Sequence, residues 1–438
     1  MKTLLTKFRS FDRPSQVLMV NQFSINVGFY MLMPYLAGYL AGPLGLAAWA
    51  VGLVLGMRNF SQQGLFLLGG TLADRLGYKP LIVAGCLLRV AGFVLLATVE
   101  SLPAILLASA ATGFAGALFN PAVRAYLAAD AGPRRVEAFA VFNVFYQAGI
   151  LLGPLIGLAL TTLDFRVTSL VAATIFAALT IVQIWTLPAH RAEITATRTS
   201  VLDDWQVVMA NRPFVLFALA MIGSYVLSFQ IYLALPLQAA VVVGDNRSDT
   251  ALVTSLFVVS GMVAIAGQFR ITSWLSRRWG SGRSVVIGMA IMALAFLPLI
   301  AVPSPSTLGG WAAAGALILT AALLAVGTAA VFPFEMDTVV TLSGGKLVAT
   351  HYGFYNTIVG VGILLGNLGT GAVFGILSAA HLGALIWAIL TIVGAASVSA
   401  LYLLDRSARL SSPPAENAVN KTDELLDGGS GSDRKVPS

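Results

Sequence analysis

Apolar runs of about 20 residues recur along this 438-residue chain and are separated by short polar breaks. A helix of about 20 residues crosses the roughly 30 Å hydrocarbon core of a bilayer. Apolar residues make up 58% of the chain and charged residues 10%, whereas soluble domains have roughly 45–50% and 25%. The sequence therefore predicts an all-α integral membrane protein and excludes a soluble domain or a β-barrel.

The apolar runs predict twelve transmembrane helices. The first run continues to about Ala41 without a small-residue cleavage site, which favours a retained helix over a signal peptide. The expected ranges are about 15–41, 46–72, 80–98, 103–127, 138–162, 166–187, 213–240, 251–272, 284–302, 311–333, 352–377 and 383–404.

Lysines and arginines are distributed unevenly over the connections. If the amino terminus is cytoplasmic, 17 lie in the inner connections and two, Arg166 and Arg247, in the outer ones. This split follows the positive-inside rule, so we expect a multi-pass protein of the inner (plasma) membrane with both termini in the cytoplasm. Inner loops that face anionic lipid account for the net charge of +7, and no nucleic-acid partner is needed. The inner residues are Lys2, Lys7, Arg9, Arg13, Arg75, Lys79, Arg134, Arg135, Arg191, Arg198, Arg212, Arg277, Arg278, Arg283, Lys346, Arg406 and Arg409.

The longest inner connection divides the runs into two sets of six, and an internal repeat agrees with this seam. FAVFNVFYQAGILLG at 139–153 resembles YGFYNTIVGVGILLG at 352–366, with Asn143 aligned to Asn356 at an offset of 213 residues. A parallel duplication predicts two pseudo-symmetric bundles that rock about a central site, although GILLG also recurs by chance in Gly/Leu-rich helices. We expect six-helix bundles at 1–188 and 213–405, a cytoplasmic linker at 189–212 and a disordered tail at 406–438. The GGSGS segment of the tail is either native or an artificial addition.

GGTLADRLGYKP, at 69–80, lies between the second and third expected helices. It resembles the G-x-L-A-D-R-x-G-R-K loop signature of the major facilitator superfamily, with Tyr78 where the family usually has Arg. The resemblance implies the twelve-helix fold of that superfamily, in which Asp74 caps helix eleven and latches the halves together while Arg75 joins a cytoplasmic charge cluster. The alternative is an ordinary charged loop. The motif residues expected to form the gate are Gly70, Asp74, Arg75, Gly77 and Lys79.

The corresponding loop of the second half, TSWLSRRWGSGR, keeps Arg277 and Gly280 but has no acidic residue matching Asp74. We therefore expect a weaker second latch.

The fifth expected helix contains G-x-x-x-G-P-x-x-G, formed by Gly149, Gly153, Pro154 and Gly157. This resembles the signature of the drug and proton antiporter branch of the superfamily. Glycines four apart remove the side chains from one helix face so that a neighbouring helix can approach, and a proline permits a kink. Generic small-residue packing is the alternative. Asn367 stands opposite Pro154 in the second half, and this asymmetry favours export over import.

Arg58 is expected near the middle of the bilayer, where a cation is costly unless it faces water or a partner. GMRNFSQQG and the following GGTLADR resemble the MdtH-like group of multidrug exporters. A structural arginine bonded to carbonyl groups of a neighbouring helix is the alternative. Arg89 and Arg124 are weaker candidates, for which snorkelling toward the cytoplasm is the alternative. The residues expected to line the substrate cavity are Asn21, Asn26, Tyr30, Arg58, Gln62, Gln63, Asn120, Arg124, Tyr146, Tyr225 and Asn356.

Proton coupling has weaker support in the sequence. It requires a titratable side chain within the membrane, and none of the 19 acidic residues is expected deep in a helix. TGFAGALFNPAVRA does not match the R-x-x-Q-G motif of many proton-coupled relatives. The candidates are Asp74 and, at the inner end of helix ten, Glu335 and Asp337, although the last two can also be inner-loop charges.

The resemblance predicts a monomeric exporter of small amphipathic molecules that exchanges them for protons. A carrier or flippase for lipids or a lipid-like metabolite is the alternative, not necessarily coupled to protons. No nucleophile, metal motif or paired acids are expected at membrane depth, so the sequence argues against an enzyme, a metal and a cofactor. The expected partners are a small-molecule substrate, protons and membrane lipids.

Overall fold

The computed structural model describes residues 2–32, 36, 39–40, 43–46, 48–161, 164–188, 200–243, 246–380 and 382–407. Every regular element in these residues is helical. The predicted disordered tail beyond residue 407, with its GGSGS segment, and linker residues 189–199 lie outside them.

The first group of helices comprises α1 (Lys2–Arg9), α2 (Arg13–Tyr30), α4 (Ala48–Gly64), α5 (Phe66–Leu76), α6 (Tyr78–Thr98), α7 (Leu102–Ala131), η1 (Gly132–Arg134), α8 (Arg135–Thr161) and α9 (Phe165–Thr186). The second group follows α10 (Val201–Ala210). It comprises α11 (Arg212–Ala220), α12 (Ile222–Ser228), η2 (Phe229–Tyr232), α13 (Ala234–Val243), α14 (Asn246–Leu294), α15 (Leu297–Ala301), α16 (Pro305–Leu308), α17 (Gly310–Ser343), α18 (Val348–Ala379) and α19 (Gly383–Arg406).

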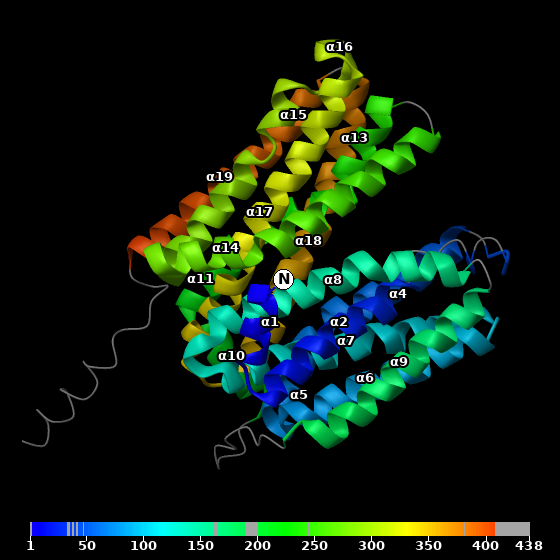
Figure 1. Cartoon of the computed structure of the whole chain (residues 1–438), viewed down its shortest axis with the longest axis vertical. Coiled ribbons are helices and arrows are strands. Elements are labelled where there is room, and N and C mark those ends of the chain that lie inside the picture. The colour runs from blue at the N-terminus through cyan, green and yellow to red at the C-terminus, as the bar shows by residue number, and fades with distance from the viewer. Residues whose placement is uncertain are drawn as a thin grey trace, which may run out of the picture.

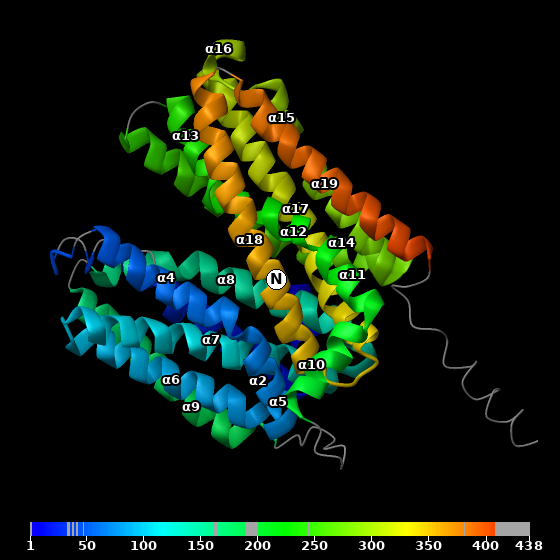
Figure 2. The ribbon, with the colours of Figure 1, turned by 180° about the vertical axis from the view of Figure 1, so that it is seen from behind.

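The two groups form separate bundles that meet at one end and diverge toward the other (Figures 1 and 2). In the first bundle α6 packs on α7 and α9, α2 on α8, and α4 on α7; in the second, α14 packs on α17 and α19. Between the bundles α18 packs on α4, α5 and α7, while α8 packs on α14 and α17. The helices α8 and α18, which carry the internal repeat, therefore provide most of the interface.

Eight stretches among the described residues are long and apolar enough to cross a membrane. Two of them, of 56 and 50 residues, contain two spans each, because η1 interrupts the first and Gly280, with φ +71°, interrupts the second. Positive φ is accessible to glycine without a steric penalty, so Gly280 permits the reversal between spans. Together with α2 and the α4–α5 pair, these elements make up the twelve-helix fold expected from the sequence.

Several boundaries differ from the expected ones. The second helix breaks at Leu65 and then continues to Leu76, and the seventh is divided into α11, α12, η2 and α13. The tenth was expected to end at Pro333 but runs to Ser343. A proline removes one backbone hydrogen bond, and within a buried helix the neighbouring elements compensate for this loss, so the helix does not have to end there.

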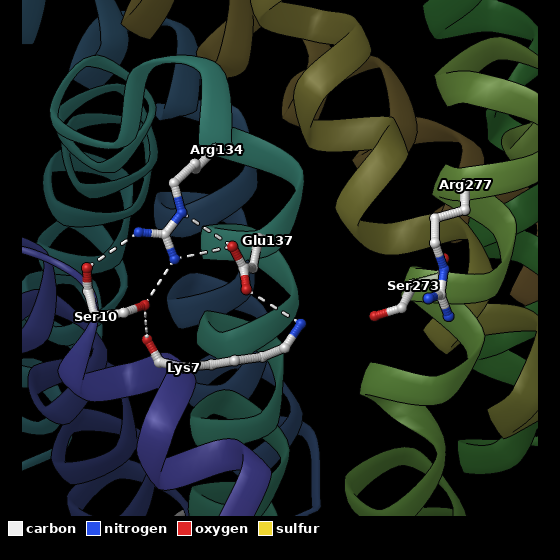
Figure 3. Close-up of polar contacts among 6 residues, drawn as sticks. All are labelled: Lys7, Ser10, Arg134, Glu137, Ser273 and Arg277. Atoms are coloured by element: carbon white, nitrogen blue, oxygen red, sulfur yellow. Dashed lines mark hydrogen bonds and ion pairs between the residues drawn. The ribbon is translucent and has the colours of Figure 1, made fainter.

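The short helices α1 and α10 were not expected from the sequence, and neither were α16 and η1. α10 lies in the linker and begins with a capping box, in which Ser200 and Asp203 each bond the other's backbone. α1 lies against the start of α8: Lys7 pairs with Glu137 at 3.1 Å, and Arg134 donates to the Ser10 hydroxyl at 2.7 Å (Figure 3). These contacts hold the described N-terminal segment against η1 and the start of α8.

Candidate functional site

Asp74 lies near the end of α5 and points at the beginning of α18 in the other bundle. One carboxylate oxygen accepts a hydrogen bond from Ala349 N at 3.1 Å. The other accepts from Thr350 N at 2.6 Å and from the Thr350 hydroxyl at 2.7 Å. Ala349 and Thr350 are the second and third residues of α18. The backbone N–H groups in the first turn of a helix have no partner within the helix. A carboxylate at this position also interacts favourably with the helix dipole.

The approach of α5 to α18 depends on glycines of both helices. A Cβ added at Gly70 would lie 2.1 Å from Ala349 O, and one added at Gly353 would lie 2.5 Å from Phe66 O. Either side chain would therefore have to push the two helices apart. Gly77, with φ +90°, then begins the turn into α6.

The two cationic residues of this loop, Arg75 and Lys79, also have partners at this end of the molecule. Arg75 pairs with Asp204 of α10 at 2.7 Å, which attaches the linker helix to the loop. Trp205, the next residue of α10, donates to the Thr71 hydroxyl at 2.8 Å. Lys79 donates to Ile184 O at 2.8 Å.

The second half has a different polar contact at the equivalent end. Arg277 donates to Ser273 O of its own helix at 3.1 Å (Figure 3). Asp337 of α17 instead pairs with Arg135, the first residue of α8, at 3.0 Å and accepts from the Ser281 hydroxyl at 2.8 Å. The sequence had suggested Asp337 as a proton site or an inner-loop charge, and its ion pair across the bundles was missed. The two residues are about 200 positions apart in the sequence, so the ion pair can be identified only from the structure.

The helix-five motif faces α2. Added Cβ atoms would lie 2.6 Å from Phe23 O at Gly149, 2.7 Å from Tyr30 Cβ at Gly153 and 2.0 Å from Met31 O at Gly157. The three glycines therefore form one continuous face along which the backbones of α8 and α2 approach closely.

The asparagines of the internal repeat make matching contacts. Asn143 of α8 donates to the Gln268 side chain of α14 at 2.7 Å. Asn356 of α18 accepts from Arg124 of α7 at 2.9 Å. Both residues are buried and each bonds a side chain of the opposite bundle. Arg124 therefore points at α18, and the alternative that it snorkels toward the cytoplasm is wrong.

Arg58 and Arg89 lie together inside the first bundle. Arg58 donates to Asn59 Oδ1 at 2.9 Å and to Gln62 Oε1 at 3.0 Å. Its guanidinium carbon is 4.3 Å from the centre of the Phe29 ring, and that of Arg89 is 5.6 Å from the same ring. Arg89 is only 6% exposed and is the twelfth of the 21 residues of α6. The alternative that Arg89 snorkels toward the cytoplasm is therefore wrong.

The second bundle contains a deeply buried acid. Glu335 is 3% exposed and lies eight residues before the end of α17, which corresponds to about 12 Å of helix. One of its oxygens accepts hydrogen bonds from the Tyr225 hydroxyl at 2.7 Å and the Tyr355 hydroxyl at 2.6 Å. The expectation that no acid lies deep in a helix is therefore wrong, because it placed the helix end at Pro333.

The other cavity candidates lie on several helices. Asn26 donates to Tyr146 O at 2.8 Å and accepts from Gln22 at 3.1 Å. Asn21 is buried, and its amide nitrogen has no hydrogen-bond partner among the described residues. Gln63 lies beside Gly360 of α18. Tyr30, Asn120 and Tyr146 are partly buried.

The sequence profile described as Major Facilitator Superfamily matches residues 18–366. The chain belongs to the major facilitator superfamily. It is 60% identical over 398 residues to an uncharacterized MFS-type transporter of Mycobacterium tuberculosis, Rv0849, covering 91% of this chain and 94% of that one. It is 28% identical over 386 residues to the multidrug resistance protein MdtH of Yersinia enterocolitica, covering 88% and 92%. The family and these relatives establish a multi-pass membrane transporter and not an enzyme.

Solved structures of the superfamily share the fold. The human organic anion transporter MFSD10 superposes with a TM-score of 0.66 at 17% identity, covering 90% of this chain and 99% of that one. The nucleoside transporter NupG superposes with a TM-score of 0.59 at 16% identity, covering 89% and 99%.

Proposed function

We propose that this transporter exports small amphipathic, drug-like molecules by alternating access in exchange for protons. The hydrogen bonds between Asp74 and the first turn of α18 carry the proposal, because they join the two bundles at the end where the bundles meet (Figure 1). The 28% identity to MdtH multidrug resistance proteins supports drug-like substrates.

The Asp74 end of the molecule is cytoplasmic in this proposal. The loops there contain most of the lysines and arginines, as the positive-inside rule requires. The protein then lies in the inner membrane as a monomer, with bundles at 1–188 and 213–405 and both termini in the cytoplasm. Asp74 and the Arg135–Asp337 pair keep the cytoplasmic side closed, and substrate leaves from the opposite side.

Glu335 is the proton site in this proposal. It is a buried acid within a span. Burying an ionisable side chain there costs free energy, and such residues mark the pathways of substrates or protons. Tyr225 and Tyr355 stabilise its ionised form by donating to one oxygen, and the other oxygen is available to a proton. Asp337, which is already paired with Arg135, contributes to closure instead.

Dye transport in proteoliposomes tests the proposal. Wild-type protein is expected to move rhodamine 6G or fluorescein against its gradient when a proton gradient is imposed. Glu335→Gln should abolish this dependence but retain dye exchange at equal pH, since the amide preserves the shape of the side chain. Glu100→Gln, at an acid whose side chain is 63% exposed, is the matched control. Wild-type transport that ignores the gradient would refute proton exchange, and transport of neither dye would refute export of such molecules.

A further inference from the structure

The arginine pair of the first bundle consists of Arg58 and Arg89. Neither forms an ion pair with any acidic residue among those described. Arg58 Nε and two nitrogens of Arg89, Nε and one terminal NH, are buried without a hydrogen-bond partner in the described part of the chain. A guanidinium has five N–H donors and no acceptor, so these unused donors need an acceptor from outside the described residues.

The two guanidiniums occupy one site and not two separate ones. Both contact the ring of Phe29. Gly116 of α7 faces both Gln62, which accepts from Arg58, and Arg89: an added Cβ would be 3.2 Å from the Gln62 carboxamide carbon and 3.3 Å from an Arg89 nitrogen. The glycine leaves room for the two polar groups to lie side by side.

Aromatic contacts offset only part of the free-energy cost of burying the Arg89 charge. Arg89 lies over Phe29, Phe119 and Phe176, at 5.2–6.0 Å from the ring centres. A single cation–π contact is weaker than the cost of leaving a buried charge without an ion-pair partner. Two like charges in one site add repulsion. The site therefore has a net positive charge that an anion would neutralise.

The described contacts do not support a purely structural role. Arg58 bonds side chains of its own helix, and no bond from Arg58 or Arg89 to a carbonyl group of a neighbouring helix is found among the described residues. Arg58 is partly exposed and Arg89 is buried behind it. Tyr30, also partly exposed, lies near Arg58 and Tyr146. This arrangement presents one reachable cation, a second cation behind it and aromatic surface beside both.

We propose that Arg58 and Arg89 form an anion subsite that selects substrates with a negatively charged group on an aromatic or apolar body. Arg58 contacts the anion directly, and Arg89 acts as a positioning residue that raises the positive potential behind it. The inference rests on the proposed function, since it names the class of molecule that the exporter takes.

Binding of two xanthene dyes to the purified protein tests the subsite. Fluorescein is an anion at pH 7.4, and rhodamine 6G is a cation with the same ring system. Fluorescence anisotropy is expected to show that wild-type protein binds fluorescein and that Arg58→Gln weakens this binding at least about tenfold, as for a lost charge-assisted contact. Arg58→Lys should retain part of the affinity. Arg13→Gln, at an exposed arginine, should bind as wild type.

Arg89→Met distinguishes the two roles, because it removes the second charge and leaves Arg58 in place. It should weaken fluorescein binding less than Arg58→Gln and reduce the dependence of the affinity on salt concentration. Thermal unfolding of each variant shows whether it is folded.

The binding and transport results test the anion subsite and the proposed export separately. Failure of wild-type protein to bind fluorescein, or equal binding by folded Arg58→Gln, would overturn the anion subsite. If rhodamine 6G is transported at the same time, export of amphipathic molecules stands and only the inference fails. Binding of fluorescein that depends on Arg58 but is never followed by transport would support the subsite and contradict the proposed export.

Discussion

Asp74 accepts two hydrogen bonds from Thr350, one from its backbone N–H at 2.6 Å and one from its hydroxyl at 2.7 Å, although the residues are 276 positions apart. Because the two residues belong to different bundles, these bonds must break when the bundles separate at this end. The carboxylate is therefore positioned to bias the equilibrium between closed and open conformations.

Asp74→Asn should favour opening at the cytoplasmic end. The lone pair of an amide nitrogen is delocalised and does not accept hydrogen bonds, so Asn cannot accept from Ala349 N at one atom and Thr350 N at the other, and one buried N–H loses its partner. Hydrogen bonds to charged groups contribute about 1.5–3 kcal/mol each, so we expect the open population to rise about tenfold or more. The measurement is maleimide labelling of Thr357→Cys in a Cys86→Ala background, since Thr357 lies at the contact of α18 with Gln63.

Asp12→Asn is the matched control for this experiment, because Asp12 is exposed and its side chain does not cap α2. Its labelling rate should equal that of the parent. Equal labelling of Asp74→Asn and the parent would show that the bonds to α18 do not hold the bundles together.

Arg135 and Asp337 should be energetically coupled. Their side chains are 29% and 13% exposed, so the pair is intermediate between exposed and buried ion pairs, and we expect a coupling energy of about 1 kcal/mol. A double-mutant cycle with Arg135→Ala and Asp337→Ala, read by the same labelling assay, measures it. Strictly additive effects would mean that the pair contributes nothing to closure.

The two repeat asparagines should act alike. Asn143→Ala leaves the Gln268 oxygen without its donor, and Asn356→Ala leaves an Arg124 nitrogen without its acceptor. Leaving a buried polar group unsatisfied costs about 1–3 kcal/mol, so each variant should destabilise the conformation described here. Increased labelling of Thr357→Cys in both is the expected result. An effect of only one would indicate that the two contacts are not equivalent in closure.

Sequence patterns located the spans because apolar length is a strong local signal, and the loop motif located Asp74 near helix eleven. They did not identify the partners of Arg75, Asp337 and Asp74. These partners, respectively Asp204, Arg135 and Thr350, are remote in the sequence. Glu335 was misplaced for a local reason: the tenth expected helix ended at about residue 333, although the helix continues to Ser343. For Arg89 the sequence left snorkelling open, because no sequence pattern reveals the three phenylalanine rings around it.

The glycine face of α8 should tolerate no added side chain where it meets α2. A Cβ at Gly157 would be 2.0 Å from Met31 O, a backbone atom that cannot rotate away. Overpacking of this kind costs about 1–3 kcal/mol, so Gly157→Ala should lower the apparent Tm by at least about 3 °C. Gly315→Ala is the matched control, since Gly315 lies in α17 with no atom within 4 Å of an added Cβ. Alanine is the better helix former, so this variant should be as stable as wild type or slightly more so. If both variants had the same Tm, close contact between α8 and α2 would not be a requirement of the fold, and the motif would need another explanation.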